Sequence, residues 1–534
     1  MVKMVLENKG EFRENCLARR QVPAAVDWDI VVIGGGATGL GVALDAVSRG
    51  YKTLLLEQSD FAKGTSSRST KLVHGGVRYL AQGDIRLVRE ASVERGLLYR
   101  NAPHLVRNLS FIIPVYNFWN RLKFTIGLKL YDWISGKLSL GPSSFISRKE
   151  TLQKLTNIKS NGLVGGVLYH DGQFDDSRLA INLAQSILDN GGCVINYMKI
   201  TGLIKNSDQR IAGVIVRDEE TGQPHHIKAK AVVNATGVFV DDILKMDNPQ
   251  SIKTICVSQG VHLVLEKKFF PSEYALMIPE TSDGRVLFAV PWHGKVVVGT
   301  TDTPVEFASL EPVALEEEIV FILETAGQYL SEKPIRSDVL SVFAGLRPLA
   351  APTGERNATK EISRSHKIMV SDSGLFTILG GKWTTYRKMG EHMVNRIETE
   401  LNWEHANSDT DSLPIHGFDK DVEWSDPFYF YGSDRIHIRN LVNGSSGKWI
   451  SYKLHIHRAQ IEWAVNKEMA RTVEDILSRR TRAILLDARE SIRIAPEVAA
   501  VMAEVLGKDE EWISDQVKAY STVAKQYILT EPDI

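Results

Sequence analysis

Three glycines near the start of the chain limit its possible folds more than any other feature. Residues 29–36 read DIVVIGGG, and the segment after them has small and apolar residues at helical spacing. Gly34, Gly36 and Gly39 therefore form G-x-G-x-x-G between an apolar strand and a helix, and YKTLLLEQ (51–58) supplies the next strand. A right-handed crossover makes two such strands parallel. The pattern predicts a β-α-β unit of the kind that binds dinucleotides.

Each glycine of this motif has its own physical role. Gly34 permits a tight turn, Gly36 lets a pyrophosphate approach the backbone, and Gly39 lets the helix pack closely against the strand. The N-terminus of the helix then faces the phosphates, where its N–H groups stabilise negative charge. Glu57 ends the second strand and is placed to accept hydrogen bonds from a ribose diol. By itself the motif is also compatible with an ordinary α/β turn, and it does not distinguish NAD from FAD.

Two distant glycine turns favour FAD over a nicotinamide cofactor. VVNATG (232–237) and LGGKWTTYR (379–387) both follow apolar runs typical of strands. An extended FAD needs contacts from such distant segments, whereas a nicotinamide enzyme usually binds its dinucleotide within one contiguous domain. The predicted cofactor contacts from these turns are Gly237, Gly381, Thr384 and Thr385. For the two threonines, which stand at the start of a helix, the alternative is a role as N-cap residues.

The remaining sequence divides into blocks of different character. Residues 255–303 contain apolar runs that favour an antiparallel sheet covering a ligand. Beyond about residue 410 the chain is helical, charged and poor in glycine. We therefore expect an α/β protein with a Rossmann-like FAD-binding domain, an antiparallel-sheet substrate (cap) domain and a helical C-terminal domain. The expected bounds are 1–27 for an N-terminal extension, 28–410 for the oxidoreductase region (FAD-binding segments about 28–110, 170–250 and 340–400; cap segments about 111–169 and 251–339) and 411–534 for the helical domain.

Composition and charge exclude several classes of function. The formal net charge is −1, so no excess of basic residues points to a nucleic-acid partner. Residues 1–20 lack the apolar centre of a signal peptide, and no run of about 18 apolar residues predicts a membrane-spanning helix. The three cysteines, Cys16, Cys193 and Cys256, are too far apart in sequence for a metal-binding spacing. We expect no metal.

Several longer segments are distinctive as a set: 31–80, AGLRPL (344–349), ISRSH (362–366), GGKWTTYRKMGE (380–391) and RRTR (479–482). Together they closely resemble the FAD-dependent glycerol-3-phosphate dehydrogenases, an aerobic, quinone-linked family. The matching segments occur in the same order and cover nearly all of the chain beyond the N-terminal extension. The resemblance implies oxidation of sn-glycerol 3-phosphate to dihydroxyacetone phosphate, with hydride transfer from C2 of the substrate to N5 of the flavin.

The polar stretch TSSRSTKLVHGGVRYL (65–80) gains a role from this resemblance, which places it around the flavin. A positive group such as Lys71 or His74 near the isoalloxazine would stabilise the negative charge that the ring acquires on reduction. The alternative is a surface loop with solvated charges. The implied cofactor contacts are Ser66, Ser67, Lys71, His74 and Gly75, and the implied substrate contacts are Arg78 and Tyr79.

The implied reaction needs a base for the C2 hydroxyl proton and positive groups for the phosphate. His262, in SQGVHLVL, matches the active-site histidine of the family, and a histidine suits this task because its pKa lies near the working pH. Arg347 and Arg364 are candidates for a guanidinium clamp on the phosphate. Lys382 is expected beside both substrate and flavin, so the predicted catalytic set is His262, Arg347 and Lys382. The alternatives are a hydrogen-bonded strand histidine and structural ion pairs.

A further segment concerns the electron acceptor. Residues 117–137 carry large apolar side chains at helical spacing with basic residues beside them, which suits a helix lying in a membrane interface or one packed on the protein core. The resemblance implies a membrane quinone as acceptor and a cytoplasmic protein held peripherally on the inner membrane. An oxidase that converts O2 to H2O2, or a related FAD-dependent amine or amino-acid oxidase, is the alternative, and a homodimer is left open. The stripe is Trp119, Leu122, Ile126, Leu130 and Trp133.

Overall fold

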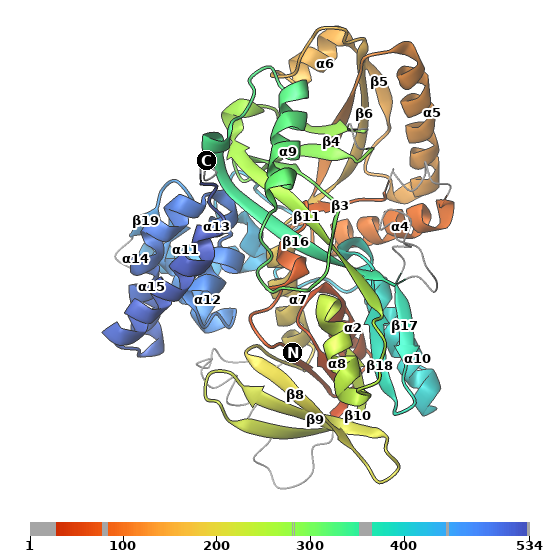
Figure 1. Cartoon of the computed structure of the whole chain (residues 1–534), viewed down its shortest axis with the longest axis vertical. Helices are drawn as coiled ribbons and strands as arrows, with labels where there is room; N and C mark the ends of the chain where they lie inside the picture. The colour runs from red at the N-terminus through yellow and green to blue at the C-terminus, as the bar shows by residue number, and fades with distance from the viewer. Residues whose placement is uncertain are drawn as a thin grey trace.

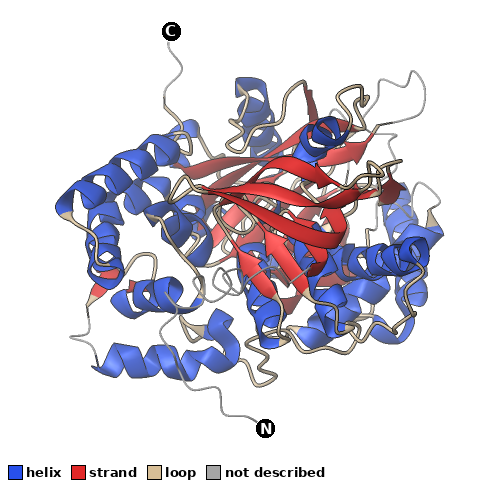
Figure 2. Cartoon of the chain, turned by 90° about the horizontal axis from the view of Figure 1, so that it is seen from below, coloured by secondary structure: helices blue, strands red, loops and turns tan. Residues whose placement is uncertain are grey.

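The computed structural model describes residues 28–530 apart from 77–83, 280, 282–283, 352–365 and 445–447. Two large sheets occupy its centre and helices surround them (Figure 2). The helices of the C-terminal part gather on one side of the sheets (Figure 1). This architecture confirms the predicted α/β class with its helical C-terminal part.

The first sheet begins with the predicted β-α-β unit. Strand β1 (Trp28–Ile33) leads through the glycine turn into α2 (Ala37–Ser48), and β2 (Thr53–Leu56) then pairs with β1 in parallel. On the other side of β1, β10 (Pro224–Asn234) pairs in parallel as well, and β18 (Leu375–Leu379) is parallel to β10. The carboxyl ends of these four strands therefore meet at one edge, and every predicted glycine turn lies there. The outer strands of this row are β7 (Cys193–Ile195) and β17 (Lys367–Val370), and the hairpin of β8 (Met198–Lys205) and β9 (Ile211–Asp218) brings the sheet to eight strands.

Both faces of this sheet are covered, which explains why its central strands read as continuous apolar runs. Helices α2, α7 (Asp176–Asp189) and α10 (Tyr386–Leu401) pack on one face. The hairpin of β8 and β9, together with α8 (Val240–Asp247), packs on the other. Strands β9 and β10 pair antiparallel and join this hairpin to the sheet.

The second sheet has ten strands and is antiparallel except where β12 meets β4. Strand β16 (Val339–Ala350) lies within the predicted cofactor-binding segment 340–400 for most of its length. It belongs to this sheet, because it pairs with β11 (Ile255–Glu266) along nearly its whole length. Helices α4 (Ile85–Asn101), α5 (Phe118–Ser135), α6 (Arg148–Lys154) and α9 (Glu316–Tyr329) lie around the sheet (Figure 1). Its strands are β3 (Leu72–Val73), β4 (Val106–Val115), β5 (Ser144–Ser147), β6 (Gly165–Phe174), β11 (Ile255–Glu266), β12 (Ala275–Ile278), β13 (Leu287–Trp292), β14 (Lys295–Gly299), β15 (Thr303–Val305) and β16 (Val339–Ala350).

The C-terminal helices form a core of their own and also contact both sheets. Their apolar cluster includes Val264, Val297 and Phe343 from the second sheet. Buried ion pairs join them to α7 and its N-cap residue, among them Arg178–Glu468 at 2.7 Å and Arg482–Asp175 at 3.0 Å. The helices are α11 (Arg435–Gly444), α12 (Arg458–Lys467), α13 (Ala483–Leu486), α14 (Ala488–Leu506) and α15 (Glu510–Lys525).

Candidate active site

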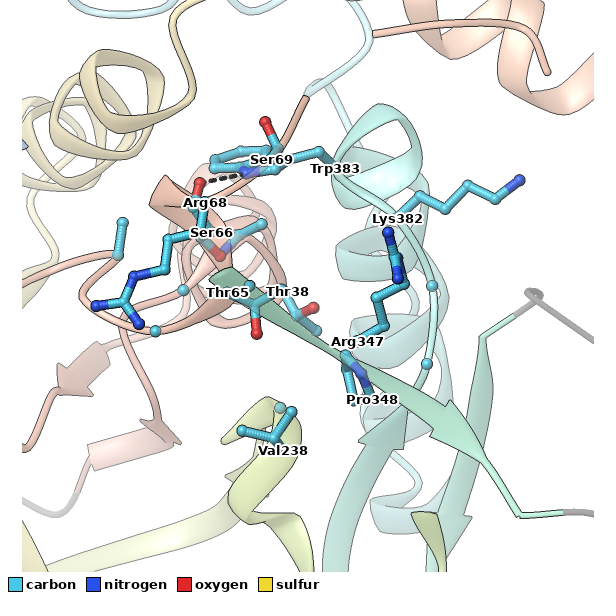
Figure 3. A pocket seen from close by; sticks show the side chains of 18 of the residues that line it. Thr38, Thr65, Ser66, Arg68, Ser69, Val238, Arg347, Pro348, Lys382 and Trp383 are labelled. Atoms are coloured by element: carbon cyan, nitrogen blue, oxygen red, sulfur yellow. Dashed lines mark hydrogen bonds between the residues drawn. The ribbon is translucent and has the colours of Figure 1, made fainter. Parts of the chain in front are cut away.

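A cavity of about 680 Å³ is lined by the carboxyl edge of the first sheet and by the second sheet (Figure 3). Two of the predicted distant glycines, Gly237 and Gly381, line it, both with a positive φ (61° and 85°) that glycine adopts without strain. Glu57, His262 and Arg347 line the same cavity. The tertiary fold therefore brings predicted cofactor and substrate residues to a single space.

The glycine motif is packed to backbone contact. Gly34 has φ 108°, and a Cβ atom there would meet the carbonyl oxygen of Ala235 at 2.6 Å. A Cβ atom at Gly39 would clash with the carbonyl oxygen of Gly34. Gly36 precedes α2 and lines the cavity, where Ser66 Oγ accepts a hydrogen bond from the first N–H of the helix at 2.9 Å. The roles predicted for Gly34 and Gly39 match this geometry.

The Glu57 carboxylate lies at the end of β2 and shapes the glycine turn. Its Oε2 accepts a hydrogen bond from the Gly35 N–H at 2.6 Å, and its Oε1 accepts one from the Ser59 N–H at 2.9 Å. Burial raises the pKa of Glu57, and these two N–H groups act in the opposite direction. Glu57 lines the cavity, and its contact with a ribose diol stays a prediction.

The polar loop after residue 64 is only partly directed at the cavity. Ser66 and His74 line it, whereas Ser67, Lys71 and Gly75 do not. The Lys71 ammonium is fully buried, 2.8 Å from Asp176 Oδ2, and it also donates to the Ser67 carbonyl at 2.7 Å. A buried ammonium needs such a counter-ion, and Asp176 supplies it to Lys71. The predicted substrate residues Arg78, Tyr79 and Arg364 lie outside the described residues.

His262 stands on β11, lines the cavity and is 2% exposed. Its Nε2 lies 2.9 Å from Thr70 Oγ1, and its ring stacks on Phe343 with centroids 4.9 Å apart. Its Nδ1 has no hydrogen-bond partner among the described residues. Burial, followed by the nearby charges of Arg347 and Lys71, holds the pKa of His262 well below the ordinary 6.5. The imidazole is therefore uncharged in the substrate-free protein.

Arg347 projects from β16 onto the same wall of the cavity. Its side chain is 24% exposed, and its guanidinium makes contacts of 3.1–3.3 Å with protein oxygens. Hydrogen bonds of this length are at the long end of the usual range, and they hold the guanidinium at the cavity wall. The acceptors are Gln259 O, Asp302 Oδ1, Thr300 Oγ1 and Thr301 O.

The glycine turn at residues 379–387 contributes the cation Lys382 and a hydrogen bond to the polar loop. Lys382 lines the cavity, and Figure 3 shows it on the same side as Arg347, across from Ser66. Trp383 Nε1 donates to the Ser66 carbonyl at 2.8 Å and ties this turn to the polar loop. Thr384 also lines the cavity, whereas Thr385 instead donates to the Lys382 carbonyl at 3.3 Å. Of the two predicted threonines, only Thr384 borders the cofactor space.

Comparisons with known proteins decide the family. A family model described as FAD dependent oxidoreductase matches residues 29–387, and one described as the C-terminal domain of alpha-glycerophosphate oxidase matches 378–513. A probable mitochondrial glycerol-3-phosphate dehydrogenase of Dictyostelium discoideum is 38% identical over 95% of this chain and 84% of that protein. The chain belongs to the FAD-dependent glycerol-3-phosphate dehydrogenase family.

Further relatives agree with this assignment. The mitochondrial glycerol-3-phosphate dehydrogenase of Homo sapiens is 37% identical over 95% of this chain and 74% of its own length. The crystal structure of the glycerol-3-phosphate dehydrogenase from Bacillus halodurans, complexed with FAD, superposes with a TM-score of 0.79 at 31% identity. It covers 98% of this chain and 99% of that one. The predicted family is therefore confirmed.

As a member of this family, the chain uses FAD, and the residues present fit that cofactor. Gly36 leaves the first turn of α2 open to the cavity, which suits a pyrophosphate at a helix N-terminus. The Glu57 carboxylate at the cavity wall suits a ribose diol, and Gly237 has open space where a side chain would stand. Within the described ranges, no cluster of three or more His, Cys, Asp or Glu residues is arranged for a metal ion.

Three residues of the candidate site are not predicted from the sequence. Thr70 is the hydrogen-bond partner of His262, and Phe343 stacks on the same ring. Trp383 fixes the polar loop from the opposite side of the cavity. Thr70 and Trp383 stand within segments that carry the family resemblance, which is the one signal that could have indicated them. Phe343 is adjacent to AGLRPL, but its stacking depends on the register of β16 against β11.

Proposed function

We propose that this chain oxidises sn-glycerol 3-phosphate to dihydroxyacetone phosphate with bound FAD and passes the electrons to a membrane quinone. The observation that carries the proposal is one cavity that joins a dinucleotide-binding glycine turn to a neutral buried histidine and two cations. A related amine or amino-acid oxidase would share the glycine turn but would have no need of cations placed for a phosphate.

The chain's own residues account for the other parts of the reaction. His262 accepts the C2 hydroxyl proton, because its buried ring is uncharged in the substrate-free enzyme. Arg347 and Lys382 bind the phosphate and so orient the substrate. Thr70 holds the His262 ring through the bond at 2.9 Å. The isoalloxazine of FAD, when bound, supplies the two-electron oxidant.

A substrate panel tests this proposal. The yellow holoenzyme is mixed without oxygen with glycerol 3-phosphate, with glycerol and with a set of amino acids. We expect the flavin band near ~450 nm to bleach with glycerol 3-phosphate alone, since the cations require a phosphate and bound flavin reports its redox state. Bleaching by an amino acid, or equal bleaching by glycerol, would refute the substrate assignment.

The membrane part of the proposal is supported by α5. The apolar stripe predicted from the sequence faces outward rather than into the protein core. Trp119 and Trp133 are 76% and 78% exposed, while Leu128 and Tyr131 on the inner side are buried. Such a helix, with basic residues beside its apolar face, suits the boundary between lipid headgroups and acyl chains. The exposed stripe consists of Phe118, Trp119, Leu122, Ile126, Leu130 and Trp133.

This outward stripe favours a lipid-soluble acceptor over oxygen. No helix in the described part of the chain is long and apolar enough to cross a membrane. Our proposal is peripheral attachment to the inner membrane at its cytoplasmic face, as the resemblance implies. Turnover of the reduced holoenzyme with a quinone in vesicles, and with O2 alone, distinguishes the dehydrogenase from the oxidase. Release of H2O2 at the quinone-supported rate would favour the oxidase.

We expect that replacing both exposed tryptophans with glutamate abolishes most vesicle binding. Burying a large apolar side chain contributes about 1.5–3 kcal/mol, so the double variant Trp119→Glu/Trp133→Glu should bind anionic vesicles at least about 100-fold more weakly. Flotation with vesicles measures binding, and flavin reduction by glycerol 3-phosphate should be unchanged. Tyr452→Glu is the matched control, because Tyr452 is 76% exposed on the C-terminal part. Equal loss in the control, or none in the double variant, contradicts the assignment.

A further inference from the structure

The segment after β2 lies over the glycine turn without regular secondary structure. Phe61 is fully buried, and a Cβ atom at Gly35 would meet its ring at 2.8 Å. The Ala62 N–H donates to the Gly35 carbonyl at 3.0 Å, and Ala62 has φ 60°. Because Glu57 accepts a hydrogen bond from Gly35 N–H, the position of residues 57–62 sets both the Gly35 amide and the Glu57 carboxylate.

Asp60, at the centre of this segment, is held by two arginines from the C-terminal part of the chain. Arg480 forms a bidentate pair with it, at 2.6 and 2.9 Å, and Arg479 Nε lies 2.5 Å from Asp60 Oδ2. The Asp60 and Arg480 side chains are fully buried, and Arg479 is 3% exposed. Both guanidinium groups hold the pKa of Asp60 below its ordinary value despite burial. We call Asp60, Arg479 and Arg480 the arginine clasp.

The clasp is itself fixed within the C-terminal part. Arg479 also donates to Asp475 Oδ1 at 2.8 Å, and Arg480 donates to the Glu468 carbonyl at 2.7 Å. Residues Asp475–Arg480 form a π-helical turn, a rare form that is frequent at functional sites. Tyr197 adds a second link, because its N–H donates to the Ser59 carbonyl and its hydroxyl donates to Asp475.

We infer that Arg479 and Arg480 are positioning residues for the adenosine half of FAD, acting through Asp60 on Glu57. The inference rests on the predicted contact of Glu57 with the ribose. A buried carboxylate that loses one guanidinium partner is left under-compensated, so the segment moves toward solvent or recruits other groups. Either change displaces Glu57, although neither arginine lines the cavity. The helical C-terminal part thereby controls how firmly the cofactor is held.

The experiment measures FAD release from the intact holoenzyme. Arg480→Met should release FAD on dilution about 10- to 100-fold faster than the parent, followed by the fluorescence of the freed cofactor. Arg387→Met is the control, because Arg387 makes a buried bidentate pair with Glu94 and shares no partner with the clasp or with residues 57–62. Thermal unfolding of both variants shows whether each loses comparable stability. Release by the control as fast as by Arg480→Met would overturn the inference, as would parent-like release by Arg480→Met.

A double-mutant cycle tests whether the clasp acts through Glu57. Glu57→Gln and Arg480→Met should each speed up FAD release, and the double variant should release FAD no faster than the faster single variant. Independent, multiplying effects would overturn the route through Glu57. If Arg480→Met does not fold, Arg480→Lys retains the charge without the bidentate fork and should give a smaller acceleration. Parent-like release by Arg480→Lys in that case refutes the clasp, whereas substrate bleaching of the flavin that remains bound tests the proposed function separately.

Discussion

His262→Ala should bind FAD normally and yet be reduced by glycerol 3-phosphate about 10²- to 10⁴-fold more slowly, the usual contribution of a general base. The ring is the proposed acceptor of the C2 hydroxyl proton, and its Nδ1 is not engaged by the protein among the described residues. The measurement is anaerobic stopped-flow reduction at saturating substrate. His170→Ala is the control, since His170 is a half-buried histidine of the second sheet that does not line the cavity.

The pH dependence of the same step gives a second measure of His262. A base with a depressed pKa stays unprotonated down to that low pKa, so the rate of flavin reduction should hold constant through the ordinary histidine range near 6.5 and fall only at lower pH. A rate that falls with a midpoint near 6.5 would contradict the burial effect. Unchanged reduction of His262→Ala would remove the residue from the mechanism.

Arg347→Ala should raise the dissociation constant of glycerol 3-phosphate by about 10²- to 10³-fold. The variant loses charge-assisted hydrogen bonds to the phosphate, and each of these contributes about 1.5–3 kcal/mol. The dissociation constant is read from the substrate dependence of anaerobic flavin reduction. Arg336→Ala is the control, because Arg336 pairs with Glu316 at the surface away from the cavity. An unaltered affinity would exclude a phosphate clamp at Arg347.

Arg347→Ala should also shift the pH profile in a defined direction. After burial, the charge of Arg347 is the largest cause of the low pKa of His262. Its removal raises that pKa, so the loss of reduction rate on acidification should begin at a higher pH than in the parent. A profile that moves to lower pH, or does not move, would contradict the electrostatic coupling of the two residues.

Local patterns in the sequence are sufficient for the β-α-β unit. The apolar strand, the glycine spacing and the small residues of α2 all act within about thirty residues, and they specify the turn through steric limits on a Cβ atom. The resemblance extends the prediction to His262, Arg347, Lys382 and FAD. These three side chains line one cavity, although their roles in catalysis stay predictions.

Contacts between distant segments decided the rest. No local pattern shows that Lys71 pairs with Asp176 inside the protein. Thr70 reaches His262 only because β11 crosses the polar loop, and Asp60 gains its arginines from residues more than four hundred positions later. The sequence by itself determined the cofactor class and the first unit, since steric and periodic rules operate over short stretches. Which charges are buried, and with which partners, was decided only by tertiary structure, because the energy of a buried charge depends on groups that the chain brings together from afar.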